Sequence, residues 1–259
     1  MNAFVDDSGI GVRQGSSILF MPAHKVRICD WLRADSIDPA TPADAWSGVS
    51  RRAALELGPD EKWAGLAVRA NRIVLKALPG RPLQWGREAI LIPPRANLEW
   101  DIGEAIDGLS HDAVIVIENW EVFEHIDELD LDFGPAGDNP LILWRGGAHT
   151  SIGASMEFLK GYGRPVWSAP DYDPEGLAIA LRLPHLAGVL APAENVLRAM
   201  LTTSRLQKRY LAQLQGAQAV LEQARHPDVR RLWAIVKSCR NALPQERLRK
   251  PLQAKAAGR

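Results

Sequence analysis

The sequence predicts an α/β protein whose central part forms a parallel sheet. Three short apolar runs, at residues 113–117, 141–144 and 165–168, are typical of strands that are buried on both faces. Each run is followed by a segment with helical spacing of its apolar side chains, and this alternation predicts parallel strands joined by helices. The composition fits a globular fold, because 46% of the 259 residues are hydrophobic and 24% are charged.

A smaller α+β region is expected to precede the sheet, over residues 1–105. Residues 18–32 carry apolar side chains at near-helical spacing, a proline-containing loop follows, and residues 62–73 form a second helical stretch. The segments RIVLKAL and LQWGREAILIPP flank the turn PGRP and predict a two-stranded pair. Two helices followed by a strand pair fit either a winged-helix module or a generic α+β cap.

The rest of the chain is expected to form a Rossmann-like domain over residues 106–200 and a helical region over residues 201–259. Acidic and basic residues are unevenly distributed along the chain. Residues 1–200 carry 18 Lys and Arg against 28 Asp and Glu, whereas residues 201–259 carry 13 against 3. The net charge of zero therefore hides a basic C-terminal region, which is suited to bind phosphate backbones without reading their sequence.

Three carboxylates are predicted to meet at one edge of the sheet. Glu118 directly follows the first apolar run, and Asp171 and Asp173 follow the third. Functional residues of such sheets gather at the carboxyl ends of the strands, and side chains two apart in an extended segment point the same way. Each acid alone also fits a helix cap or a solvent-facing position. Together they predict a site for Mg²⁺ (or Mn²⁺), because close carboxylates repel one another without a cation and hard cations prefer oxygen ligands.

The segments VIVIENWEVFE, LILWRGG and VWSAPDYDPEGLAIALRL occur in this order. Together they resemble the TOPRIM domain of the topoisomerase VI A subunit family and, equally, that of the JetD nuclease of the Wadjet anti-plasmid system. The resemblance covers roughly residues 108–200 and extends weakly to LPQERL. It implies that the three carboxylates bind the metal and act on DNA, with Glu175 as a further metal ligand and Asn119 beside them.

The position of the tyrosines favours hydrolysis. Topoisomerase VI A subunits attack DNA with a tyrosine on a winged-helix domain that precedes the TOPRIM domain. Here the three tyrosines, Tyr162, Tyr172 and Tyr210, all lie within or after the TOPRIM-like region. We therefore expect a metal-dependent endonuclease that uses activated water, which is the chemistry that similarity to JetD implies.

Seven basic side chains are expected to contact DNA. Two lie after the second strand and the others on the C-terminal helices; they are Arg145, His149, Arg205, Lys208, Arg209, Arg230 and Arg231. The alternative for each is an ordinary solvated surface charge.

Three other functions stay open. The chain is alternatively a non-catalytic DNA-binding or assembly subunit with a TOPRIM fold, or a transesterase like the topoisomerase VI A subunit. A haloacid-dehalogenase-like phosphatase would also place two aspartates after a strand, but it needs them after the first strand and needs Thr or Val where Glu175 stands.

Partners and location follow from the same resemblance and from the composition. Similarity to JetD implies a defence role with an SMC-like ATPase complex. A homodimer is expected if the nuclease cuts both strands, because double-strand cleavage needs two active sites. The acidic N-terminus, two cysteines without metal-ligand spacing and the absence of a long apolar run lead us to expect a cytoplasmic protein without a membrane span.

Overall fold

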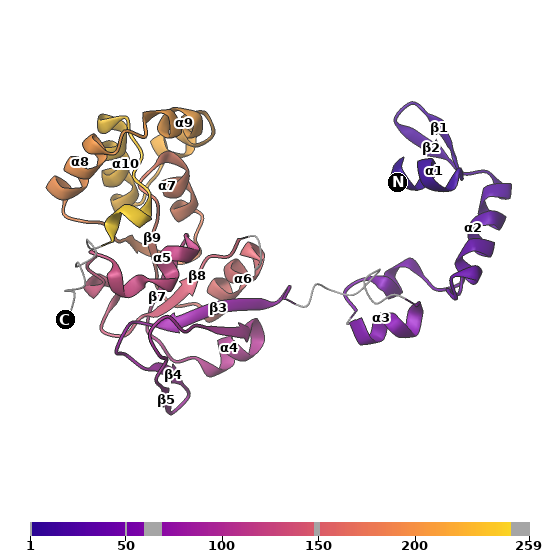
Figure 1. Cartoon of the computed structure of the whole chain (residues 1–259), viewed down its shortest axis with the longest axis horizontal. Helices are drawn as coiled ribbons and strands as arrows, with labels where there is room; N and C mark the ends of the chain where they lie inside the picture. Colours follow the sequence, from indigo (N-terminus) through magenta and orange to yellow (C-terminus); the bar gives the residue numbers. More distant parts are fainter. Residues whose placement is uncertain (1, 50, 60–68, 148–150, 250–259) are drawn as a thin grey trace, which may run out of the picture. The chain divides into compact units, whose positions relative to one another are not determined.

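The computed structural model describes residues 2–49, 51–59, 69–147 and 151–249. The chain divides into two compact units, Met1–Val68 and Arg69–Arg259. The first unit contains α1 (Asn2–Ser8), β1 (Val12–Gln14), β2 (Ser17–Leu19), α2 (Pro22–Ala34), a short 3-10 helix (Ala43–Trp46) and α3 (Arg51–Leu57) (Figure 1).

The first unit differs from the expected helical pattern. The helix predicted over residues 18–32 begins only at Pro22, because Ile18 pairs with Arg13 in the β1–β2 hairpin and proline suits the first turn of a helix. Most of the second helical stretch, residues 62–68, lies outside the described residues, and its end at Arg72 is already part of a strand.

A six-stranded sheet forms the centre of the second unit (Figure 1). Its strands, in spatial order, are β10 (Leu186–Val189), β9 (Val166–Ala169), β7 (Val114–Ile117), β8 (Leu141–Trp144), β3 (Arg72–Ala77) and β6 (Leu98–Asp101). The first four strands are parallel, and β3 pairs antiparallel with both β8 and β6. The predicted α/β class with a mostly parallel sheet is confirmed, although β10 was not predicted.

The predicted strand pair near residue 80 was wrong. The strand β3 does not pair with the segment that follows it; it enters the central sheet between β8 and β6. The hairpin forms further along, between β4 (Leu83–Trp85) and β5 (Glu88–Ile90). The burial of β3 explains the difference, because five of its six residues are buried, as in an interior strand of a sheet.

Helices cover both faces of the sheet. Along β7, Ile115 and Ile117 belong to one hydrophobic core and Val114 and Val116 to the other, since successive side chains of a strand point to opposite faces. The first core contains residues of α5 (Trp120–Glu124) and α7 (Pro174–Leu181), and the second contains residues of α4 (Ile102–Gly108) and α6 (Ile152–Tyr162). This two-sided burial explains the continuous apolar runs of the sequence.

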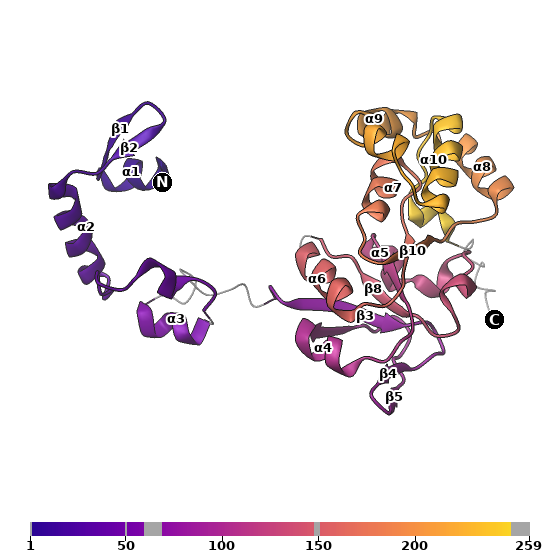
Figure 2. The same ribbon diagram turned by 180° about the vertical axis from the view of Figure 1, so that it is seen from behind.

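Three helices follow β10 and pack beyond α7 (Figure 2): α8 (Glu194–Thr203), α9 (Gln207–Glu222) and α10 (Pro227–Cys239). The nearly continuous helix expected after residue 193 is broken, because Arg205 adopts a left-handed conformation with φ of 58°. The segment expected to be a basic tail includes a 3-10 helix at Gln245–Leu248. Among the described residues, no helix is long and apolar enough to cross a membrane.

The His111 side chain links the segment before β7 to Gln84 on β4 and to Asn139, just before β8. Its Nε2 accepts a hydrogen bond from the Gln84 N–H at 2.9 Å, so Nδ1 carries the proton and donates to the Asn139 carbonyl at 2.8 Å. The side chain is buried, and this burial lowers the pKa of His111 below its ordinary value of 6.5. The folded protein therefore keeps this histidine neutral.

Acidification should destabilise the protein through His111. Protonation would place a second N–H against the Gln84 donor, and the unfolded chain binds a proton at higher pH than the folded chain. The free energy of unfolding should therefore fall as the pH drops below about 6.5, by at most about 1.4 kcal/mol per pH unit. Chemical denaturation at about pH 7.5 and about pH 5.5 measures this loss. His111→Gln should reduce the loss and the exposed control His185→Gln should not; equal losses in all three proteins would contradict the assignment.

Candidate functional site

Glu118 lies directly after β7, at the carboxyl end of the strand. Its Oε1 accepts a hydrogen bond from Nη2 of Arg145, at the end of β8, over 3.2 Å. Its Oε2 is buried and has no hydrogen-bond partner among the described residues. Burial raises the pKa of Glu118 to about 7; Arg145 opposes the shift, and the negative charges of Asp171, Asp173 and Glu175 add to it. The four carboxylates are therefore close enough to repel one another.

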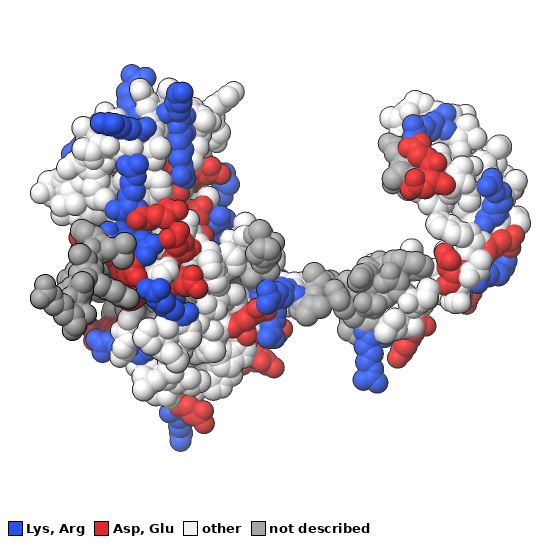
Figure 3. Space-filling view, viewed as in Figure 1, with Lys and Arg blue, Asp and Glu red and all other residues white. Residues whose placement is uncertain are grey.

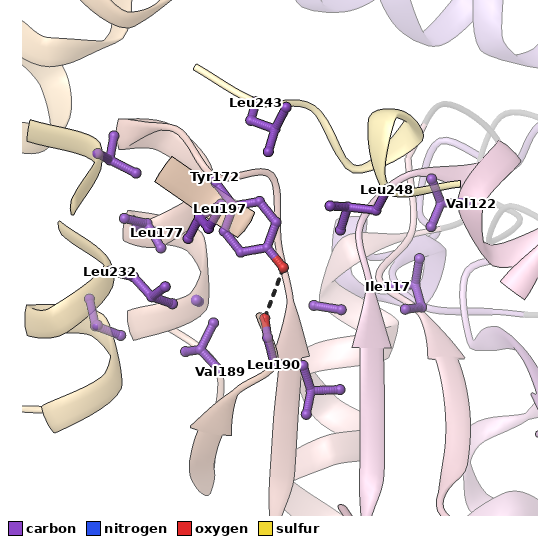
Figure 4. Close-up of a cluster of buried hydrophobic side chains, with 14 of the residues drawn as sticks. Ile117, Val122, Tyr172, Leu177, Val189, Leu190, Leu197, Leu232, Leu243 and Leu248 are labelled. Atoms are coloured by element: carbon purple, nitrogen blue, oxygen red, sulfur yellow. Dashed lines mark hydrogen bonds between the residues drawn. The ribbon is translucent and has the colours of Figure 1, made fainter. Parts of the chain in front are cut away.

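Asp171 and Asp173 follow β9 and flank a fully buried tyrosine. Tyr172 points into the core between the sheet and the C-terminal helices, where its hydroxyl donates to the Leu190 carbonyl at 3.0 Å (Figure 4). The two aspartates share Arg209 of α9, whose Nη2 lies 2.5 Å from Asp171 Oδ2 and 2.8 Å from Asp173 Oδ2. The alternation of the extended segment thus brings both aspartates to one cation.

Asp173 also begins α7. Its Oδ1 accepts a hydrogen bond from the Gly176 N–H at 2.8 Å, which satisfies a free N–H of the first turn. A Cβ atom at Gly176 would lie 2.3 Å from the Asp171 carbonyl oxygen, so no other residue fits there without moving the aspartate segment. The glycine of the sequence DYDPEG is therefore a packing requirement of this turn.

Glu175 lies in the first turn of α7 and shares a neighbour with the aspartates. Nε2 of Gln213, on α9, lies 3.2 Å from both Asp173 Oδ2 and Glu175 Oε2. Gln213 was not singled out in the sequence, because a glutamine within an amphipathic helix carries no signal of its own. Its place one turn after Arg209 puts both side chains on the same face of α9.

The expected DNA-contacting residues fall into two groups. Arg145 and Arg209 are engaged by the carboxylates, and the Arg145 side chain is only 17% exposed. The remaining described members are exposed; they are Arg205, Lys208, Arg230 and Arg231. His149 lies outside the described residues.

Gln245 and Glu246 also belong to the site, and sequence reasoning missed both. The Gln245 N–H donates to Asp171 Oδ1 at 2.9 Å, which partly offsets the rise in the pKa of Asp171 that burial causes. Glu246 Oε1 accepts from Nδ2 of Asn119, the residue after Glu118, at 2.7 Å. The signal available in the sequence was the segment LPQERL, which has no periodic pattern and lies more than seventy residues after Asp171.

The donors of this site suit a hard divalent cation. All are carboxylate oxygens, and Glu118 Oε2 has no hydrogen-bond partner within the part of the chain that the structure describes. As the side chains stand, no three His, Cys, Asp or Glu groups within the described part of the chain are arranged to hold a metal ion. Arg145 and Arg209 instead supply the positive charge. Glu118, Asp171 and Asp173 thus offer the oxygen donors that Mg²⁺ or Mn²⁺ prefers, and in this structure they are paired with Arg145 and Arg209.

Comparison with known families identifies the family of the second unit. Residues 71–252 match the family described as a domain of unknown function (DUF7281). The match covers the six-stranded sheet, the carboxylates and the C-terminal helices. No match was found among curated proteins.

Removal of the Arg209 guanidinium should destabilise the protein. The Asp173 side chain is 1% exposed, so Arg209→Met leaves a buried carboxylate without its charged donor. We expect the free energy of unfolding to fall by about 1–3 kcal/mol, measured by urea denaturation. Asp173→Asn keeps the Oδ1 acceptor for Gly176 but removes the charge, so Arg209→Met should cost less in that background. An equal cost in both backgrounds would contradict this account.

Proposed function

The chain belongs to the DUF7281 family, whose description names no activity, and we propose from the site itself that it is a metal-dependent DNA endonuclease that hydrolyses phosphodiester bonds. The observation that carries this proposal is the meeting of Glu118 with Asp171 and Asp173 at the carboxyl ends of two adjacent parallel strands, β7 and β9. The chain passes from β7 to β8 on one side and returns to β9 on the other, so the strand order reverses at β7. Ligand sites of open α/β sheets lie at such a reversal.

Glu118, Asp171 and Asp173 would hold Mg²⁺ or Mn²⁺, with Glu175 beside them. A bound ion of this kind lowers the pKa of its water and stabilises negative charge on a phosphate. The chain's own contribution is electrostatic. Arg145 and Arg209 bring positive charge next to the carboxylates, which would otherwise repel the DNA backbone.

The basic C-terminal helices supply a surface for the DNA backbone. Figure 3 shows Lys and Arg side chains gathered over this part of the molecule, above a group of acidic side chains. Arg205 and Lys208 lie at the start of α9, within four residues of Arg209, which contacts the aspartates. DNA bound to these exposed cations would therefore run close to the carboxylates. Such contacts neutralise phosphates and give affinity without sequence preference.

The tyrosines support hydrolysis over transesterification. The chain has three tyrosines, and all are buried: Tyr162 is 9% exposed, Tyr172 is 0% exposed and Tyr210 is 3% exposed. A nucleophile must reach the phosphate, and a buried phenol cannot do so without rearrangement. A topoisomerase VI A-like mechanism would therefore lack its attacking group.

The biological setting is proposed from the TOPRIM resemblance alone. Similarity of this segment order to JetD of the Wadjet system favours a role in defence against plasmids or phages. In that role the nuclease would act with an SMC-like ATPase complex that selects the DNA. A homodimer would place two sites on one duplex.

Plasmid cleavage tests the proposed activity. We expect the full chain to nick or linearise supercoiled plasmid with Mg²⁺ or Mn²⁺ and not with EDTA. Glu118→Gln and Asp171→Asn preserve side-chain size but remove metal-binding charge, so each should slow cleavage by roughly 100-fold or more. The matched control Glu194→Gln, an exposed acid on α8, should cut like the wild type. Cleavage that survives both site substitutions would overturn the assignment.

If the wild type does not cleave the plasmid, the chain is either a nuclease that needs its partner or a non-catalytic DNA-binding subunit. The ion pairs of Arg145 with Glu118 and of Arg209 with both aspartates favour the non-catalytic subunit, because two positive charges offset part of the negative charge without a metal. Thermal unfolding with Mn²⁺ separates the two cases. Stabilisation of about 2.7 kcal/mol at 100 times the dissociation constant indicates a nuclease that needs its partner, and no stabilisation indicates the binding subunit.

The salt dependence of DNA binding tests the basic surface. Arg205→Glu combined with Lys208→Glu should weaken binding to a duplex oligonucleotide of any sequence. It should also flatten the plot of log affinity against log salt by about 0.9 for each lost phosphate contact. Fluorescence anisotropy at several salt concentrations measures both effects. Lys160→Glu combined with Arg164→Glu makes the same charge change at exposed positions near the end of α6, and similar weakening there would refute the assigned surface.

A further inference from the structure

Residues 241–249 cross the end of the sheet that carries the carboxylates. The backbone of Leu243 pairs with that of Tyr172 in both directions, with N···O distances of 2.9 Å and 3.1 Å. Leu243 and Leu248 are buried in the core shown in Figure 4, which also contains Ile117 at the end of β7. The segment is thus packed into the site end of the fold, between the strand that precedes Glu118 and the segment that carries the aspartates.

Gln245 joins the two strand ends. It is 1% exposed, and its Nε2 donates to the carbonyl of Ala169, the last residue of β9. Its Oε1 accepts from the N–H of Asn119, just after Glu118, at 3.2 Å. Its backbone N–H donates to Asp171 Oδ1 at 2.9 Å. One buried residue therefore contacts the segment of Glu118, the end of β9 and Asp171 itself.

Asn119 provides a second tie to the same segment. Its Oδ1 caps α5 by accepting from the Val122 N–H at 3.1 Å, while its Nδ2 donates to Glu246 Oε1 at 2.7 Å. Both groups of the amide are used, so the residue after Glu118 is fixed by its own helix on one side and by Glu246 on the other. The position of Glu118 is thereby linked to residues 245–246.

We propose that Gln245 is a positioning residue that sets the separation between Glu118 and Asp171. The inference rests on the proposed function, in which these two acids share a cation. The negative charges of the buried carboxylates oppose their approach at the paired ends of β7 and β9, and the hydrogen bonds of Gln245 tie these two strand ends together. A residue that orients metal ligands through hydrogen bonds changes affinity for the metal when it is replaced, although it does not touch the ion.

Mn²⁺ binding to the full chain, followed by isothermal titration calorimetry, tests this role apart from catalysis. Gln245→Met keeps the length of the side chain but removes both of its hydrogen bonds. We expect the dissociation constant for Mn²⁺ to rise by roughly 10–100-fold. Tyr162→Phe is the matched control, because it removes a buried hydroxyl bonded to His111, which precedes the start of β7 at the opposite end of that strand. This control should bind Mn²⁺ like the wild type, even if its melting temperature falls as far as that of Gln245→Met.

Asn119→Ser tests the same link without changing Gln245. The serine hydroxyl keeps an acceptor that can cap α5 but removes the donor to Glu246 without adding charge, so Mn²⁺ affinity should again fall. If Gln245→Met does not fold, the titration of this Asn119 variant tests the proposal in its place. Wild-type affinity in either folded variant, or equal weakening in Tyr162→Phe, would overturn the positioning role. A wild type that binds no Mn²⁺ would overturn the proposed function itself, and the positioning role with it.

Discussion

Repulsion among buried carboxylates is the constraint around which this end of the fold is organised. Glu118, Asp171 and Asp173 project from adjacent parallel strands, and burial denies them the water that would screen their charges. The parallel pairing of β7 with β9 makes their approach unavoidable, because both strands end at the same edge. Arg145 and Arg209 offset this repulsion with positive charge. Gln213 and Gln245 donate hydrogen bonds to the two aspartates.

The parallel core could be predicted from the sequence because its strands are buried on both faces. Such strands appear as continuous apolar runs, and the runs at residues 113–117, 141–144 and 165–168 match β7, β8 and β9 to within one residue at each end. The place of β3 could not be predicted in the same way. Its pairing with β8 is set by packing across more than sixty residues of chain, and a run followed by a turn looks locally like half of a hairpin.

The candidate site likewise combines residues that could be predicted from nearby sequence with residues that could not. The carboxylates could be singled out because each directly follows a recognisable strand. Arg209 was noticed only as a basic residue, since nothing near it in the sequence indicates that α9 packs against α7 and brings it to Asp171. Gln245 carried no signal beyond its place in the segment LPQERL, because the role of one glutamine becomes visible only when its three hydrogen-bond partners, more than seventy residues earlier in the chain, are brought together.

The position of residues 241–249 in the chain also bears on the order in which the site is assembled during synthesis. Every carboxylate of the β7 and β9 ends leaves the ribosome before this segment does. The parallel sheet and its acids can therefore form while Tyr172 still lacks its backbone partner, Leu243. The last contacts of the site are made only after residues 241–249 have been synthesised. A site of the proposed kind would thereby stay incomplete until this segment is made, without any separate inhibitor.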